Sequence, residues 1–260
     1  MDYLRGLRRL REDPDWLSKI GVGSLLLLSA WVIPFLGQVV LAGWGAVIVR
    51  RAVSGQETPL PRLELDFDYL GKLLGGGFKV FLAGLIWGLP ATILIMSGVF
   101  CLYFGAVFTA IGGAAAGGEA GAGLGGLGML CAFGVGFPLL MLVSLLIQMP
   151  AQMAVIRAEL ADDLNGALQF GPVLEMTRLV LRELVIGSLV LAFVQWVMMA
   201  GSMLLCGLPL IPCTVAMIVA RSHFAAQLYQ RYLEKGGTAI PLAHPEVDGA
   251  RPGEIAASTF

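Results

Sequence analysis

Four long stretches without a single acidic or basic side chain dominate this 260-residue chain. They are residues 20–49, 80–118, 120–156 and 184–220. A helix of about 20 apolar residues crosses the ~30 Å hydrocarbon core of a bilayer, so each stretch is long enough to span a membrane. Charged residues make up 13% of the chain and its mean hydropathy is +0.82, whereas a soluble domain carries about 25% charged residues. The sequence therefore predicts an integral membrane protein.

Breaks within these stretches indicate how the chain crosses the bilayer. Prolines and glycines at 34–37 and 207–212, and a glycine–alanine run at 111–126, divide the apolar sequence into paired segments. In lipid only helices and closed barrels bond all their backbone groups, and these runs lack the alternation of barrel strands. We therefore expect an all-α polytopic integral membrane helical bundle over residues 17–235, with six transmembrane helices as three hairpins. The expected passes are about 17–33, 35–50, 79–110, 127–156, 183–206 and 210–230.

Basic side chains predict the orientation. All 17 Lys and Arg residues fall on one side of this threading, within 5–19, 50–79, 157–182 and 221–251. Because cytoplasmic loops carry the excess of Lys and Arg, we expect a prokaryotic cytoplasmic (inner) membrane protein with both termini in the cytoplasm. The first apolar stretch begins at Leu17 behind a charged segment and has no small-residue cleavage site, which favours a retained anchor over a signal peptide.

The glycine–alanine run at 111–126 has three interpretations. The simplest is an exposed loop between the third and fourth passes, because each glycine inside a helix costs about 1 kcal/mol. Small residues also let helices approach closely in lipid, so a helix seam is the alternative. A pore lining is the weakest, because Glu119 is the only polar side chain in the run.

Residues 1–16 form a basic amphipathic segment on the expected cytoplasmic side. On a helical wheel Tyr3, Leu7 and Leu10 share one face. This pattern is typical of a helix that lies on an anionic membrane surface, with a tryptophan at the headgroup level. A solvated arm, or one folded against the other loops, is the alternative. The candidate membrane-surface residues are Arg5, Arg8, Arg9 and Trp16.

The other cytoplasmic segments are also partly amphipathic. From Asp66 to Phe78 apolar residues recur at helical spacing, which predicts an interfacial helix leading into the third pass. Before the fifth pass, Asp162 or Asp163 is placed to cap a helix. Residues 236–260 contain three prolines and little apolar sequence, so this cytoplasmic tail is expected to be disordered or bound to another molecule.

Three of the expected passes end in similar sequences. These are AVIVR at 46–50, AVIR at 154–157 and AMIVAR at 216–221. Three parallel repeats of a hairpin unit would produce this pattern. Helices that leave the bilayer in small apolar residues and Arg would produce it as well, so the pattern leaves repetition open.

Proline, glycine and tryptophan positions in four segments carry a family resemblance. The segments are DPDW before the first pass, SGQETPLP after the second, DYLGKLLGGGFKVFLAGLIWGLP into the third and LNGALQFGPV before the fifth. Together they resemble the bacterial and archaeal membrane family called domain of unknown function 4013, over roughly residues 10–230. The resemblance implies a multi-pass membrane protein and assigns no activity.

Glutamines inside the apolar passes are the candidates for a polar intramembrane site. Gln148 and Gln152, one turn apart across Pro150, form the best pair. Such side chains more often hydrogen-bond neighbouring helices than bind a substrate. The candidates are Gln148, Gln152 and Gln195. No hydrolase, nucleotide-binding or zinc motif is present, and His223 and His244 are isolated, so we expect no catalytic residue, no metal and no cofactor.

Two cysteines flank the turn between the fifth and sixth passes. Cys206 and Cys213 would lie in a compartment that permits disulfides. A bridge requires Cα atoms within ~7 Å, and bundle thiols also serve as small apolar packing groups. A Cys206–Cys213 disulfide is therefore one of two alternatives.

These features favour a non-enzymatic membrane protein. The first hypothesis is a scaffold or subunit of a membrane complex that recruits protein partners, or further copies of itself, through its cytoplasmic loops. The alternative is a permease or channel for a small neutral or lipidic solute. A lipid-modifying enzyme is a third hypothesis, which requires titratable groups that converge at the inner rim. The lipid bilayer is an expected partner and nucleic acid is not, because no basic face is large enough to follow a phosphate backbone.

Overall fold

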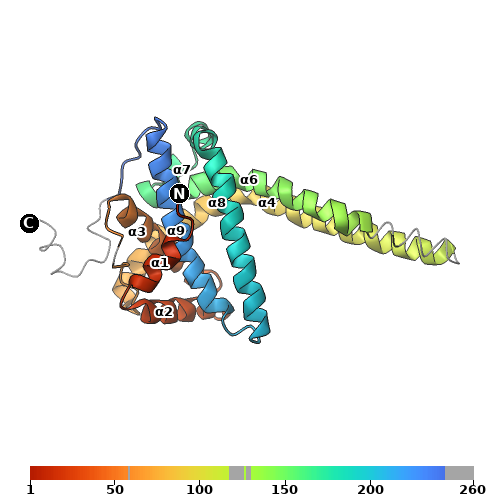
Figure 1. Cartoon of the computed structure of the whole chain (residues 1–260), viewed down its shortest axis with the longest axis horizontal. Helices are drawn as coiled ribbons and strands as arrows, with labels where there is room; N and C mark the ends of the chain where they lie inside the picture. Colours follow the sequence, from red (N-terminus) through yellow and green to blue (C-terminus); the bar gives the residue numbers. More distant parts are fainter. Residues whose placement is uncertain (58, 117–125, 127–129, 244–260) are drawn as a thin grey trace, which may run out of the picture. The chain divides into compact units, whose positions relative to one another are not determined.

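The computed structural model describes residues 1–57, 59–116, 126 and 130–243, and the regular structure of these residues is helical throughout (Figure 1). The expectation of an all-α protein is confirmed. The helices are α1 (Arg5–Glu12), α2 (Trp16–Leu28), the 3-10 helix η1 (Ser29–Trp31), α3 (Leu36–Val53), α4 (Phe67–Ala116), the π-helical turn η2 (Ala132–Gly136), α6 (Phe137–Ala161), α7 (Leu164–Ala167), α8 (Phe170–Leu204) and α9 (Leu210–Glu234).

Four helical segments are long and apolar enough to cross a membrane, which supports the membrane assignment. They are Leu36–Val53, Phe67–Thr109, Gly134–Ala161 and Phe170–Leu204. The apolar stretch Trp16–Trp31 is shorter, and α9 carries Arg221 near its middle and Arg231 near its end. The structure thus describes an all-helical protein with four helices of membrane-spanning length, and the count of six passes remains a prediction.

The chain divides into two compact units where the sequence predicts one transmembrane domain. Unit 1 contains residues 1–84 and the chain from residue 152 onward, and unit 2 contains residues 85–151. Helices α4 and α6 contribute to both units.

Helix α3 is the central helix of unit 1. It contacts α2, η1 and α9. Its side chains Leu41, Trp44 and Ile48 are buried, and they join residues of α2, α4 and α9 in one hydrophobic cluster. The interior of unit 1 is therefore built around a helix that the sequence predicts as a membrane pass.

A close approach of α3 and α4 depends on two glycines. A Cβ atom added at Gly43 would lie 2.1 Å from the Leu73 carbonyl oxygen, and one added at Gly77 would lie 1.9 Å from the Val39 carbonyl oxygen. Both distances are far below van der Waals contact, so the two backbones touch only because these side chains are absent. Gly77 belongs to the GGG segment that carries the family resemblance, and this part of the motif is a packing feature.

Helix α1 is folded against α9. A Cβ atom added at Gly6 would lie 2.6 Å from the Ala220 Cα atom, and the rings of Tyr3 and Phe224 are 6.1 Å apart. The alternative of an arm folded against the other loops is met through Glu57, which Arg5 and Arg9 bond, but the main packing partner of α1 is α9, which the sequence predicts as a pass.

Unit 2 contains the remainder of α4 and the first part of α6, packed antiparallel. Gly98 of α4 faces the side chain of Leu140, and Gly136 faces that of Leu102, so residue numbers rise along one helix as they fall along the other. Figure 1 shows the two helices side by side.

Helix α4 is longer than the sequence predicts. The expected interfacial helix and third pass are one helix of 50 residues that includes Pro90. It continues to Ala116, so the prediction of a loop at 111–126 is wrong for residues 111–116, where three alanines favour a helix despite two glycines. Residues 117–125 and 127–129 lie outside the described residues, so the exposed loop at 111–126 remains a prediction there.

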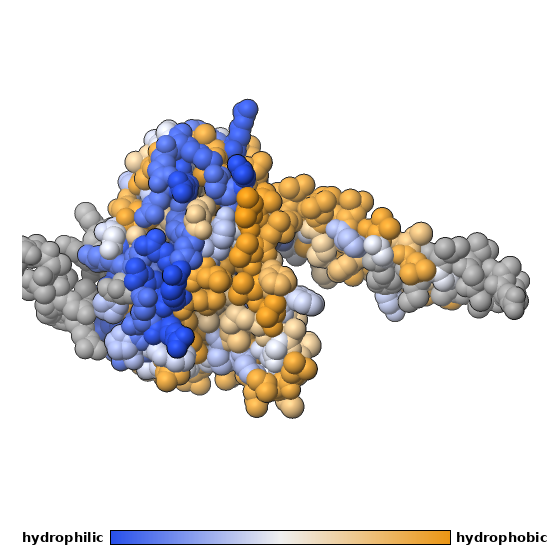
Figure 2. Space-filling model, viewed as in Figure 1, coloured by the Kyte–Doolittle hydropathy of each residue, from blue (hydrophilic) through white to orange (hydrophobic). Residues whose placement is uncertain are grey.

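Unit 1 has separate apolar and hydrophilic surfaces. Figure 2 shows apolar residues along α8, where Leu189, Phe193 and Trp196 are exposed, and hydrophilic residues elsewhere on the same face.

The folded part of the chain extends past the expected boundary at 235, because the Tyr229 hydroxyl bonds the Ile240 backbone and the Ala243 amide donates to the Leu160 carbonyl at 2.9 Å. The rest of the tail, 244–260, lies outside the described residues.

Candidate functional site

A short non-helical segment between α3 and α4 crosses unit 1, and we call residues 59–64 the strap. Its side chains Leu60 and Leu63 are each 2% exposed. Prolines at 59 and 61 prevent a helix here. A buried backbone without secondary structure needs other hydrogen-bond partners.

Side chains from α2, α3 and α4, and that of Asp13 between α1 and α2, supply those partners. The Leu60 amide donates to Asp13 Oδ2 at 2.7 Å, and Lys19 Nζ donates to the Leu60 carbonyl at 2.8 Å. Trp44 Nε1 of α3 donates to the carbonyl of residue 61 at 3.2 Å, and the Tyr69 hydroxyl of α4 donates to the carbonyl of residue 62 at 2.9 Å. The strap is thus held in one conformation by polar bonds along successive residues.

A buried ion pair is at the centre of this network. Lys19 Nζ lies 2.8 Å from Asp13 Oδ2, and the two side chains are 8% and 0% exposed. Asp13 Oδ1 also accepts the Asp15 amide at 2.9 Å, whereas the Asp15 side chain does not cap α2. Two segments of the family resemblance, DPDW and SGQETPLP, therefore meet through Asp13 and Leu60.

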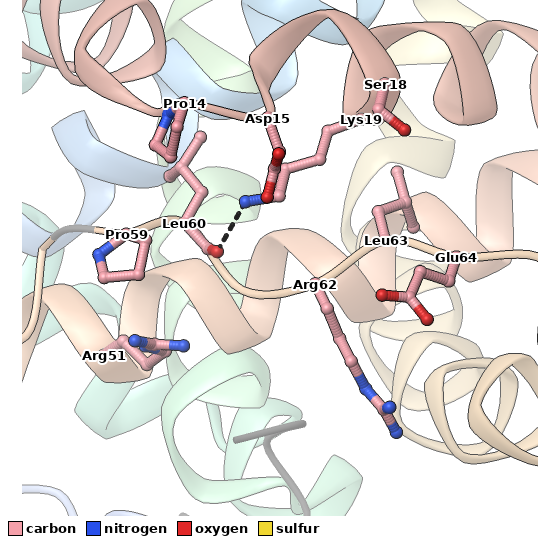
Figure 3. Close-up of a pocket in the computed structure, with 10 residues that line it drawn as sticks. All are labelled: Pro14, Asp15, Ser18, Lys19, Arg51, Pro59, Leu60, Arg62, Leu63 and Glu64. Carbon is pink, nitrogen blue, oxygen red and sulfur yellow. Dashed lines mark hydrogen bonds between the residues drawn. The ribbon is translucent and has the colours of Figure 1, made fainter. Parts of the chain in front are cut away.

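A cavity of about 370 Å³ lies beside the strap, which we call the strap cavity (Figure 3). It is lined by Pro14, Asp15, Ser18, Lys19, Arg51, Pro59, Leu60, Arg62, Leu63 and Glu64. In Figure 3, Lys19 reaches from α2 to the strap backbone, and the side chains of Arg51 and Arg62 lie on the opposite side of the strap ribbon.

The charges around the strap cavity do not neutralise one another. The Nε atoms of Arg51 and Arg62 are buried and have no hydrogen-bond partner among the described residues. The Arg62 guanidinium lies 4.5 Å from the centre of the Tyr69 ring, a cation–π contact. Asp15 and Glu64 form no ion pair within the described part of the chain. Two cations and two anions thus border one cavity without pairing directly.

The residues predicted to contact the membrane surface lie in contacts within unit 1. Arg5 and Arg9 both bond the Glu57 carboxylate, and Arg8 bonds Asp2. A hydrogen bond to Glu12 raises the pKa of the Arg9 guanidinium above its ordinary value. Trp16 is partly buried against the hydrophobic cluster around α3.

The predicted polar intramembrane residues lie in different environments. Gln152 Oε1 accepts a hydrogen bond from the Ser188 hydroxyl at 3.1 Å. Gln195 is exposed on α8, and Gln148 is half-buried in unit 2. The structure therefore gives one of the three glutamines an interhelical hydrogen bond.

The two turn cysteines are free thiols in this structure, so it does not contain the candidate disulfide. Cys206 is exposed and has a left-handed backbone with φ of 56°, and Cys213 Sγ lies 3.8 Å from the Ser202 hydroxyl oxygen.

Sequence reasoning missed a cluster of charged residues contributed by three helices, with Glu159 and Arg50 near the ends of α6 and α3 and Arg221 in the middle of α9. Glu159 of α6 lies within electrostatic reach of Arg221 of α9 and Arg50 of α3. The two arginines end two of the three similar sequences at 46–50, 154–157 and 216–221. The similarity of these sequences was the available signal. It did not predict the cluster, because Glu159 lies two residues after the sequence at 154–157 and nothing in the sequence identifies its neighbours.

The fold and the strap define an all-helical protein with membrane-length apolar helices, in which charged segments pack around α3. The chain belongs to the family described as Protein of unknown function (DUF4013), whose model matches residues 26–227. The family assignment made from sequence motifs is confirmed, although the match begins after the DPDW segment. No curated protein and no solved structure matches the chain.

Proposed function

We propose that this protein is a non-enzymatic subunit or scaffold of a membrane complex in the prokaryotic cytoplasmic membrane. Six helical passes, as three hairpins, anchor the chain with both termini in the cytoplasm. The charged segments between and beyond the passes form one folded cytoplasmic layer, which is the surface that recruits a protein partner or a further copy of the chain.

One observation carries this proposal, namely a series of ion pairs that joins all four charged segments. Arg9 Nε of the N-terminal segment lies 3.1 Å from Glu57 Oε2 of the first connection. Lys79 Nζ, at the end of that connection, lies 2.9 Å from Asp162 Oδ2 of the next one. The C-terminal segment is joined in the same way, with Lys235 Nζ 2.8 Å from Glu183 Oε1.

These pairs support the predicted orientation, because paired segments must lie on the same side of a membrane. Exposed ion pairs contribute little stability singly, about 0–1 kcal/mol each. What matters here is the position of the pairs, not their energy. They give the charged segments a fixed arrangement, and a fixed surface binds a partner at a lower entropic cost than loose loops.

Cysteine labelling in intact cells tests the orientation. The four native cysteines are replaced by serine, and Glu119→Cys is compared with Asp68→Cys, at the opposite end of the same hydrophobic segment. We expect a membrane-impermeant maleimide to label residue 119 in intact cells and residue 68 only after permeabilisation. Labelling of residue 68 in intact cells would overturn the orientation.

Affinity purification in a mild detergent tests the subunit role. We expect either a reproducible stoichiometric partner or a defined homo-oligomer. The charge reversal Glu57→Lys, which replaces the shared acceptor of Arg5 and Arg9, is expected to reduce recovery of the complex. A monomer that carries a co-purified solute would overturn the subunit role and favour the permease alternative.

A further inference from the structure

The strap cavity has a charge pattern that the subunit role does not use. The geometry points to a binding site for a phosphate group joined to an amine, as in the headgroup of a zwitterionic phospholipid: Arg51 and Arg62 hold the phosphate, and Asp15 and Glu64 hold the ammonium group. This inference does not depend on the proposed function, because a lipid site is compatible with a subunit or a permease.

The arginine side of the cavity fits a phosphate. A guanidinium presents a planar set of donors that matches phosphate oxygens, and hydrogen bonds to charged groups are stronger than neutral ones. The buried Nε groups of Arg51 and Arg62 have no protein partner within the described residues. Neither guanidinium forms an ion pair within the described residues, so its positive charge is available to attract a phosphate. Lys19 does not compete for the phosphate, because it is bonded to Asp13 and the Leu60 carbonyl.

The two carboxylates define the second half of the ligand. Asp15 and Glu64 are exposed at the cavity and form no ion pair with any residue that the structure describes. A ligand that carried only negative charge would be repelled by them, whereas an attached ammonium group would be attracted. The cavity volume of about 370 Å³ is in the range of small-molecule sites.

Apolar side chains beside the lining residues favour a lipid as the source of this group. Leu17 precedes Ser18, Leu65 follows Glu64, and Phe67 begins α4. All three are exposed, and Phe67 is 90% exposed. Large apolar side chains next to a polar binding site suit the boundary between headgroups and acyl chains.

Native mass spectrometry of the full chain in detergent tests this inference. Phosphatidylethanolamine and phosphatidylglycerol are added in turn, and bound lipid is counted. We expect the unsubstituted protein to prefer phosphatidylethanolamine, and Arg51→Gln with Arg62→Gln to weaken its binding about tenfold or more, as expected for lost charge-assisted bonds. Arg11→Gln, which changes an exposed arginine of α1 outside the cavity, is the matched control and should bind normally.

The carboxylate half has its own variant. Asp15→Asn with Glu64→Gln should remove the preference for phosphatidylethanolamine over phosphatidylglycerol while leaving phosphate binding in place. Asp68→Asn, an exposed aspartate outside the cavity lining, should keep the preference. An unchanged preference in the Asp15 and Glu64 variant would overturn the assignment of the amine.

Competition on the unsubstituted chain identifies the source and does not depend on how the variants fold. Added O-phosphoethanolamine should displace phosphatidylethanolamine, with a lower affinity than the lipid. Equal or higher affinity for the free compound would support the chemistry and assign a soluble ligand in place of the lipid. No displacement by O-phosphoethanolamine, or phosphatidylethanolamine binding that survives both arginine changes, would overturn the site.

Discussion

Helices α3 and α4 are both apolar enough to cross a membrane, yet the protein covers them very differently. In α3, 72% of the most apolar window is buried within the protein, compared with 11% in α4. Hydropathy measures the preference of a side chain for leaving water, and it does not distinguish burial against protein from burial in lipid. The comparison shows that α3 serves as the core of unit 1, while most of the apolar surface of α4 is not covered by the described residues.

The side chains of the two helices match these roles. Glycines along α3 let its neighbours approach to backbone contact, as at Gly43. The part of α4 in unit 2 instead carries exposed aromatic residues, and the ring centres of Phe100 and Phe104 are 4.2 Å apart. Specific packing should therefore control the stability of unit 1 more than that of unit 2.

The largest expected effect is the loss of the buried ion pair that holds the strap. Asp13→Ala leaves Lys19 charged and buried and removes the acceptor of the Leu60 amide. We expect the free energy of unfolding in detergent to fall by about 3–5 kcal/mol. Glu12→Ala, in an exposed pair with Arg9, should cost about 0–1 kcal/mol. Equal losses would contradict a structural role for the buried pair.

A matched pair of leucines tests the difference in burial directly. Leu41 of α3 is 1% exposed and Leu139 of α6 in unit 2 is 58% exposed. Leu41→Ala should lower the free energy of unfolding by about 2–5 kcal/mol because it leaves a cavity. Leu139→Ala should change it by about 0.5 kcal/mol or less. Urea titration in detergent measures both, and a larger loss for Leu139→Ala would reverse the comparison.

Substitution of two glycines tests whether the packing around each one is rigid or can adjust. Gly77→Ala places a methyl group against the Val39 carbonyl of α3, so the backbones must move apart, at about 1–3 kcal/mol. Gly98→Ala in unit 2 meets only the Leu140 side chain, which can rotate, and alanine gains up to about 1 kcal/mol in helix propensity. Thermal unfolding of both variants measures these changes in stability, and a stabilised Gly77→Ala protein would refute the close contact.

The smallest effect concerns the one predicted glutamine that has an interhelical bond. Gln152→Leu removes the bond to Ser188 and should cost about 0.6 kcal/mol, the average for such bonds between membrane helices. The exposed Gln195→Leu should be neutral in the same unfolding assay. A substantial loss in Gln195→Leu would show that this residue has a partner in detergent.

Several details of the site were within reach of the sequence, and others were not. The sequence narrowed the cap before the fifth pass to Asp162 or Asp163, and Asp163 accepts the amides of Asn165 and Gly166 at the start of α7. A local rule reaches this choice because capping depends on the nearby backbone. The partner of Asp13 at residue 60 is 47 positions away, and no local rule identifies such a contact.

Local patterns were enough to predict a helical chain with membrane-length apolar segments and to identify its family, because apolar length, charge distribution and proline and glycine positions act locally along the chain. Three-dimensional packing was needed to show that α3 is covered by protein, that Asp13 and Lys19 hold the strap, and that Arg51 and Arg62 line one cavity with Asp15 and Glu64. These features depend on which distant segments come together, and apolar packing that is favourable in many arrangements does not specify one of them without the complete set of polar bonds and close contacts.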